Sequence, residues 1–209
     1  MDLRLYVITD SRLLAGRSLV EAVEEAIRGG ATVIQYREKE APTRRMVEEA
    51  RLLRALCKAR GIPFIVNDRI DVALAVDADG VHVGDDDMPV WLARKILGPR
   101  KIIGASADTV EKAILYASEG ANYLGVGSVY ATSTKPDAGS PIGLEGLRKI
   151  LQVASVPVVA IGGINEANAR EVMETGVAGI AVISAVMGAP DIFEATRRLR
   201  KIVDEVLGS

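Results

Sequence analysis

Cysteine and histidine are almost absent from this sequence of 209 residues. Cys57 is its one cysteine and His82 its one histidine. A single cysteine excludes an intramolecular disulfide and a zinc site built from cysteines. Because no second histidine could share a catalytic role, we interpret His82 as a packed or hydrogen-bonded structural residue.

An excess of one charge and long apolar runs are also lacking. The net charge is −2 and no Lys/Arg-rich run occurs, which argues against a nucleic-acid partner. No apolar run approaches the ~20 residues that cross a bilayer, and the start, Met1-Asp2-Leu3-Arg4, lacks the pattern of a signal peptide. We therefore expect a cytoplasmic protein that binds neither nucleic acid nor membranes. The sequence does not determine whether the chain forms a homo-oligomer.

What the sequence does contain is an alternation of short apolar runs with amphipathic stretches. Runs rich in Val and Ile that lack polar alternation are typical of parallel strands buried on both faces. Eight runs fit this description: Arg4–Ile8, Thr32–Tyr36, Pro63–Val66, Gly80–Val83, Lys101–Gly104, Tyr123–Gly127, Val156–Ile161 and Gly179–Ile183. The helical stretches between and after them include Leu19–Arg28, Arg44–Arg60, Val110–Glu119, Glu166–Glu174 and Asp191–Val206.

Eight is the number of strands that closes a parallel barrel. The alternative is an open doubly wound sheet, but no G-x-G-x-x-G follows the first strand. The even spacing of the units also favours the barrel. We predict an α/β fold, a (β/α)8 TIM barrel, as a single domain over residues 1–209, since no linker or low-complexity segment divides the chain.

Charged side chains follow several of the predicted strands, where barrels carry their chemistry. The cations are Arg37, Lys39 and Lys135, and the carboxylates are Asp68 and Asp87. Mg²⁺ commonly takes one or two carboxylates together with substrate phosphate oxygens. Cations and a metal together can stabilise a diphosphate as a leaving group. The pattern therefore predicts a diphosphate substrate and one Mg²⁺ ion.

Glycines and a serine at the ends of the last two strands indicate a second phosphate site. Gly162-Gly163 follow the seventh strand and Ser184 follows the eighth. Loops at these places often bind phosphate in such barrels, because glycine lets backbone N–H groups approach an anion. We therefore expect a second, monophosphorylated substrate, so that the partners are small phosphorylated molecules.

Taken in order, the motifs resemble those of the thiamine-phosphate synthase family over nearly the whole chain. They are Gln35-x-Arg37-x-Lys39, Asn67-Asp68, residues 80–84 with Asp87, Thr132-x-Thr134-Lys135, and residues 160–164. The resemblance implies that a hydroxymethylpyrimidine diphosphate is joined to a thiazole phosphate. It also implies that pyrophosphate would depart first, leaving a carbocation that the thiazole nitrogen would attack.

The resemblance also implies roles for single residues. The pyrimidine diphosphate would contact Gln35, Tyr36, Arg37, Glu38, Lys39, Asn67, Ser106 and Lys135. The thiazole phosphate would contact Thr132, Ser133, Thr134, Gly163, Ile183 and Ser184. Asp68 and Asp87 would hold the metal, with Asp86 as the alternative to Asp87, and Lys135, Arg37 and Ser106 would be catalytic. Independently of the resemblance, the loop from Ser128 to Gly143 has sixteen residues without a helix or strand pattern. Connections of this length are usually functional or disordered, so we predict a lid that closes over both substrates, with a solvated linker as the alternative.

Other interpretations stay open at this point. A thiazole tautomerase-like relative would need the thiazole-phosphate site without the full diphosphate clamp, and a sugar-phosphate isomerase or epimerase would need no Mg²⁺–diphosphate site. A barrel that only binds a phosphorylated metabolite would release no pyrophosphate. Arg37 and Lys39 could also form surface ion pairs with Glu38 or Glu40, and Trp91 is expected to pack against the barrel from its helix.

Overall fold

The computed structural model describes residues 1–132, 134 and 140–208. Its eight strands form a closed barrel in which each strand pairs in parallel with the next, and β8 pairs with β1. The strands are β1 Leu5–Ile8, β2 Val33–Tyr36, β3 Phe64–Asn67, β4 Gly80–Val83, β5 Ile102–Ala107, β6 Tyr123–Val126, β7 Val158–Ile161 and β8 Gly179–Val182. The predicted TIM barrel is thus confirmed, and the open sheet is excluded.

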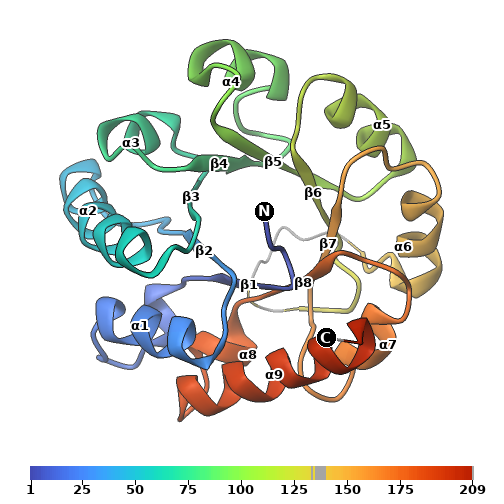
Figure 1. Cartoon of the computed structure of the whole chain (residues 1–209). Helices are drawn as coiled ribbons and strands as arrows, with labels where there is room; N and C mark the ends of the chain where they lie inside the picture. Colours follow the sequence, from blue (N-terminus) through green and yellow to red (C-terminus); the bar gives the residue numbers. More distant parts are fainter. Residues whose placement is uncertain (133, 135–139, 209) are drawn as a thin grey trace.

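Helices surround the ring of strands (Figure 1). They are α1 Leu19–Gly29, α2 Thr43–Arg60, α3 Ile70–Ala75, α4 Val90–Leu97, α5 Val110–Ser118, α6 Gly143–Leu151, α7 Ala169–Met173, α8 Ser184–Met187 and α9 Ile192–Leu207, with a 3-10 turn, η1, at Ser11–Leu13. Among the described residues, no helix is both long enough and apolar enough to cross a membrane.

Two apolar layers hold the fold together. The larger one lies between the strands and the helices and includes Val7, Leu53, Phe64 and Leu199. The smaller one fills the barrel interior with Leu3, Tyr6, Ile8, Val33, Ile65, Tyr123, Val159 and Ala181. Figure 1 places the N-terminus inside the ring of strands, and buried Leu3 belongs to the interior layer. The N-terminal segment therefore helps to close one end of the barrel, opposite the carboxyl ends of the strands.

One expectation about packing was wrong. Trp91, near the start of α4, is 51% exposed rather than packed against the barrel. The neighbouring Val90 and Ala93 are buried instead. On a helix of eight residues only one narrow face meets the core, and Val90 and Ala93, three residues apart, occupy it.

Candidate functional site

Two adjoining cavities open at the carboxyl ends of the strands. Both are lined by Gly84, Ser106, Gly125 and Ile183, so they meet at the centre of the rim. One has a volume of about 210 Å³ and the other about 230 Å³. Parallel strands point all their carboxyl ends to one rim, which is why residues from distant parts of the chain meet here.

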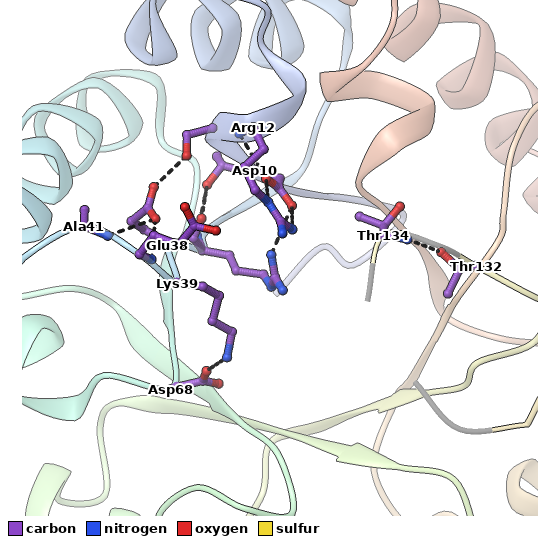
Figure 2. Close-up of polar contacts among 12 residues, drawn as sticks. Asp10, Arg12, Glu38, Lys39, Ala41, Asp68, Thr132 and Thr134 are labelled. Carbon is purple, nitrogen blue, oxygen red and sulfur yellow. Dashed lines mark hydrogen bonds and ion pairs between the residues drawn. The ribbon is translucent and has the colours of Figure 1, made fainter. Parts of the chain in front are cut away.

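The cavity of about 230 Å³, called the larger cavity below, contains the charged groups predicted from the sequence. Its lining includes Gln35, Arg37, Lys39, Asn67, Asp68, Asp87 and Ser106. Lys39, in the loop after β2, donates to Asp68 Oδ2 over 2.5 Å (Figure 2). Arg37 does not pair with Glu38 or Glu40 but with Asp10, at 3.1 Å. The interpretation of these two cations as surface ion pairs with their neighbours in sequence is therefore wrong.

The backbone around β1 and β2 fixes Arg37. The Arg37 N–H donates to the Thr9 hydroxyl over 2.9 Å, and the Asp10 carboxylate, 3% exposed, holds both Arg37 and Arg12. Burial raises the pKa of Asp10, but the hydrogen bonds and charge of Arg12 outweigh it and bring the pKa below the ordinary value. Asp10 therefore stays ionised and keeps the Arg37 guanidinium oriented.

Asp68 and Asp87 come from neighbouring strand ends and lie close together. Burial raises the pKa of Asp87, and the Asp68 carboxylate beside it raises it further. The Gly84 N–H donates to Asp87 Oδ2 over 2.7 Å, and both this hydrogen bond and the nearby charge of Lys39 lower the pKa. Two carboxylates facing each other are the arrangement that a cation relieves. Among the described residues no group of three or more His, Cys, Asp or Glu could hold a metal, so a metal here would complete its shell with water and phosphate oxygens.

The other two carboxylates of the same loop have different surroundings. Asp85 accepts from Lys112 over 2.5 Å and from the Tyr116 hydroxyl over 2.8 Å, both on α5. Asp86 lines both cavities. The proximity of Asp87 to Asp68 favours Asp87 over Asp86 as the second ligand.

The smaller cavity gathers the residues predicted for the thiazole phosphate. Thr132, Thr134, Gly163, Ile183 and Ser184 all line it. Gly163 has φ +66°, and a Cβ there would lie 2.7 Å from the carbonyl oxygen of Ala131. Both the positive φ and the close approach of the Ala131 backbone therefore require glycine at this position. Thr134 N donates to Thr132 Oγ1 over 3.2 Å, across the rim from Lys39 in Figure 2.

Two predicted contacts, Tyr36 and Glu38, line neither cavity. The Tyr36 side chain points outward and its hydroxyl donates to Glu49 of α2 over 2.8 Å. Glu38 accepts from the Ser11 hydroxyl and from the N–H groups of Glu40 and Ala41, so its carboxylate shapes the loop. Ser133 and Lys135 lie outside the described residues, as do residues 136–139 of the predicted closing segment.

Comparison with known proteins places this site in a family. The family model described as thiamine monophosphate synthase matches residues 5–186. The thiamine-phosphate synthase of Chloroflexus aurantiacus is 60% identical over 203 residues, which cover 97% of this chain and 94% of that protein. That of Pyrococcus furiosus is 59% identical over 206 residues, which cover 99% and 97%.

The chain belongs to the thiamine monophosphate synthase family. A solved structure, that of a thiamine phosphate pyrophosphorylase from Pyrococcus furiosus, superposes with a TM-score of 0.92 at 58% identity and covers 99% of this chain and 98% of that one. The structure of a 3-hexulose-6-phosphate synthase, at 19% identity and a TM-score of 0.66, shares the fold alone.

Three residues at the rim and in the interior of the barrel were not predicted from the sequence to be part of the site. Asp10 orients Arg37, and Tyr6 and Tyr123 line the larger cavity from inside the barrel. Asp10 follows the first strand at the position where the other functional groups follow theirs, which is a signal that could have identified it. Tyr6 and Tyr123 lie within apolar runs, where a hydroxyl gives no periodic signal.

Proposed function

We propose that this chain joins a hydroxymethylpyrimidine diphosphate to a thiazole phosphate, forming thiamine phosphate and releasing pyrophosphate. The observation that carries the proposal is the pair of adjoining cavities at one rim. One combines cations with a carboxylate pair, and the other presents glycine backbone and hydroxyl groups. The names of relatives at 50–60% identity support the same activity. The barrel would act as one domain over residues 1–209.

The larger cavity would bind the pyrimidine diphosphate. Arg37 and Lys39 would bind the phosphate oxygens as charge builds on the departing pyrophosphate, with Arg37 held in place by Asp10. Gln35, Asn67 and Ser106 would orient the pyrimidine. Lys135, which lies outside the described residues, stays a prediction from the sequence as a further cation for the leaving group.

One Mg²⁺ ion would be held by Asp68 and Asp87. When bound, it would neutralise charge on the diphosphate and make it a better leaving group. The crowding of the two carboxylates, visible in the raised pKa of Asp87, fits a divalent cation. Lys39, which contacts Asp68, would supply a further positive charge for the phosphate groups.

The smaller cavity would place the thiazole phosphate next to the pyrimidine. The backbone of Gly163 and the hydroxyls of Thr132, Thr134 and Ser184 would bind its phosphate, and Ile183 would contact the ring. The pyrimidine carbocation left by departure of pyrophosphate would then lie beside the thiazole nitrogen that attacks it. Location in the cytoplasm and the state of oligomerisation stay predictions from the sequence.

A pyrophosphate assay tests this proposal directly. We expect release of pyrophosphate only when both substrates and Mg²⁺ are present, with thiamine phosphate formed in equal amount. A thiazole tautomerase or a sugar-phosphate isomerase would release none, and a protein that only binds would show affinity without turnover. Any of these results would reject the proposed reaction.

A further inference from the structure

A chain of hydrogen bonds crosses the barrel interior beneath the larger cavity. Gln35 Nε2 donates to the Tyr6 hydroxyl over 2.9 Å, and the hydroxyls of Tyr6 and Tyr123 lie 2.7 Å apart. The Tyr123 hydroxyl lies 3.0 Å from His82 Nδ1. On the other side of the imidazole, Nε2 lies 2.9 Å from Ser106 Oγ. This relay of five side chains therefore links two predicted substrate contacts, Gln35 and Ser106.

The relay places polar side chains in the barrel interior, where packing alone would not require them. Tyr6 and Tyr123 are each 1% exposed and Gln35 is 2% exposed. Burying such polar groups is unfavourable unless each finds a partner. Deeper in the interior the layer is filled by apolar Leu3, Val33 and Ile65, so apolar side chains can close this barrel.

Two strand glycines make room for the relay. A Cβ on Gly104 of β5 would lie 2.1 Å from Tyr123 Cζ and 2.5 Å from His82 Nδ1. A Cβ on Gly125 of β6 would lie 3.0 Å from His82 Cε1. Glycine inside a strand weakens it and commonly marks a close approach. Here the groups that approach are the rings of the relay.

The hydrogen-bonding capacities of the five groups give the relay a direction. An amide N–H can only donate, so the Tyr6 hydroxyl accepts from Gln35, and its own hydrogen finds an acceptor when it donates to Tyr123. In that arrangement Tyr123 would donate to His82 Nδ1, which places the imidazole hydrogen on Nε2, and Nε2 would donate to Ser106. The Ser106 hydrogen is thereby left to donate to a ligand, and Gln35 Oε1 is left to accept from one.

We infer that Tyr6, Tyr123 and His82 are positioning residues that fix this donor–acceptor polarity and so select an aminopyrimidine over the corresponding oxopyrimidine. The inference rests on the proposed function. An amino substituent offers an N–H to Gln35 Oε1, and a ring nitrogen offers an acceptor to Ser106. An oxo substituent would face Gln35 Oε1 with a second acceptor. An isolated glutamine could rotate its amide and exchange the positions of Nε2 and Oε1. Within the relay, that rotation would reverse the direction of every hydrogen bond as far as Ser106.

The test compares the aminopyrimidine diphosphate with its oxo analogue in the full-length protein. We expect Tyr6→Phe, which frees the Gln35 amide, to reduce the ratio of the two kcat/KM values by about 10-fold or more, since an unpaired polar group in a binding site costs on that order. The KM for the thiazole phosphate should not change. Tyr116→Phe, which removes a tyrosine hydroxyl bonded to Asp85 outside the relay, is the matched control and should leave the ratio unchanged.

Tyr123→Phe provides a second variant, because it cuts the relay at its centre. Since His82 is the one histidine of the chain, its imidazole nitrogens can be followed by ¹⁵N NMR without further assignment. We expect the wild type to show the neutral tautomer with hydrogen on Nε2, and Tyr123→Phe to show a mixture of tautomers and a lowered substrate ratio.

The outcomes separate the relay from the reaction itself. A wild type that releases no pyrophosphate would reject the proposed function. A wild type that turns over, together with variants that lose activity on both pyrimidines in equal proportion, would show the tyrosines to be merely structural. A hydrogen on Nδ1 in the wild type would reverse the assigned direction and overturn the inference.

Discussion

Asp68 combines a strained backbone conformation with a carboxylate that lines the larger cavity. Its φ is +60°, a left-handed conformation that is uncommon for residues other than glycine. Its N–H still donates to the carbonyl oxygen of His82 over 2.8 Å, so the strand pairing continues through it. Outliers of this kind collect at functional sites because surrounding structure holds them there.

We predict that Asp68→Ala lowers turnover by about 100-fold or more, because a bound metal supplies several kcal/mol of charge stabilisation. Excess chelator should abolish turnover of the wild type. Asp71→Ala is the control, since Asp71 pairs with Arg69 on the surface and is more exposed. Steady-state kinetics with varied Mg²⁺ would check both variants. Full turnover in chelator would contradict the metal assignment.

Gly163 and Gly143 allow a matched test of the monophosphate site. Their φ values are +66° and +65°, but a Cβ at Gly163 meets the backbone of Ala131, whereas one at Gly143 meets nothing within 4 Å. We expect Gly163→Ala to raise the KM for the thiazole phosphate by about 10-fold, because the clash with Ala131 would displace the backbone that binds the phosphate, and a lost hydrogen bond to a charged group costs about 1.5–3 kcal/mol.

Gly143→Ala should share the backbone strain and lose stability without a change in that KM. Kinetics with each substrate varied in turn would separate the effects. If Gly163→Ala instead weakened only the pyrimidine diphosphate, the two cavities would have been assigned in the wrong order.

At the scale of helices and strands, the apolar runs predicted all eight strands with small errors at their ends. The largest error was at β5, which extends to Ala107 rather than Gly104. Small residues there, Ala105 and Ser106, carry little β-propensity by themselves, but pairing with β6 holds them in the strand. The short helices α3 and α8 were not predicted as amphipathic stretches, because four to six residues span fewer than two helical turns, which is too few for a repeating apolar pattern.

The start of a helix is less predictable than its body. Thr43 would be a suitable N-cap, yet the structure has Pro42 there with no side-chain cap, and Thr43 accepts from Arg69 instead. Asp191 does cap α9, where its side chain accepts from Glu194 N over 2.8 Å. The difference depends on the path of the preceding loop, which the local sequence does not specify.

We therefore predict that Asp191→Ala lowers the free energy of unfolding by ~1 kcal/mol, the usual loss for a capping side chain. Thr43→Ala should cost less, because no helix cap is lost. Urea unfolding followed by circular dichroism would measure both. Equal losses in the two variants would show that the cap is not what stabilises α9.

For the whole molecule, the sequence predicted the barrel and the rim on which the charged groups gather, because alternation of strands and helices fixes the topology. It did not predict contacts that depend on closure. Arg4, immediately before β1, pairs with Asp2 and with Asp204 of α9. Asp204 also pairs with Arg200, which donates to the Gly30 carbonyl oxygen after α1. These ion pairs join the two ends of the chain where the barrel closes.

The ion pair of Asp2 with Arg4, together with the carboxylates of Asp10 and Glu38, makes the free energy of unfolding depend on pH in the acidic range. The hydrogen bond from Arg4 holds the pKa of Asp2 below its ordinary value of 3.8. The pKa of Glu38 is also lowered, because hydrogen bonds from Ser11 and three backbone N–H groups outweigh the opposing effect of burial. In the unfolded chain these values return to normal. The carboxylates therefore stabilise the fold fully above the ordinary values, and their contribution is lost as the pH falls through the lower values of the folded state.

We predict a melting midpoint that is nearly constant between about pH 6 and pH 5 and that falls steeply below about pH 4, where these carboxyl groups take up protons on unfolding. Asp2→Asn should have a lower midpoint at neutral pH and a shallower fall in acid, because asparagine has no proton to take up. Differential scanning calorimetry across this range would measure both curves. Parallel curves for the wild type and the variant would mean that the ion pair of Asp2 with Arg4 contributes nothing to the acid sensitivity.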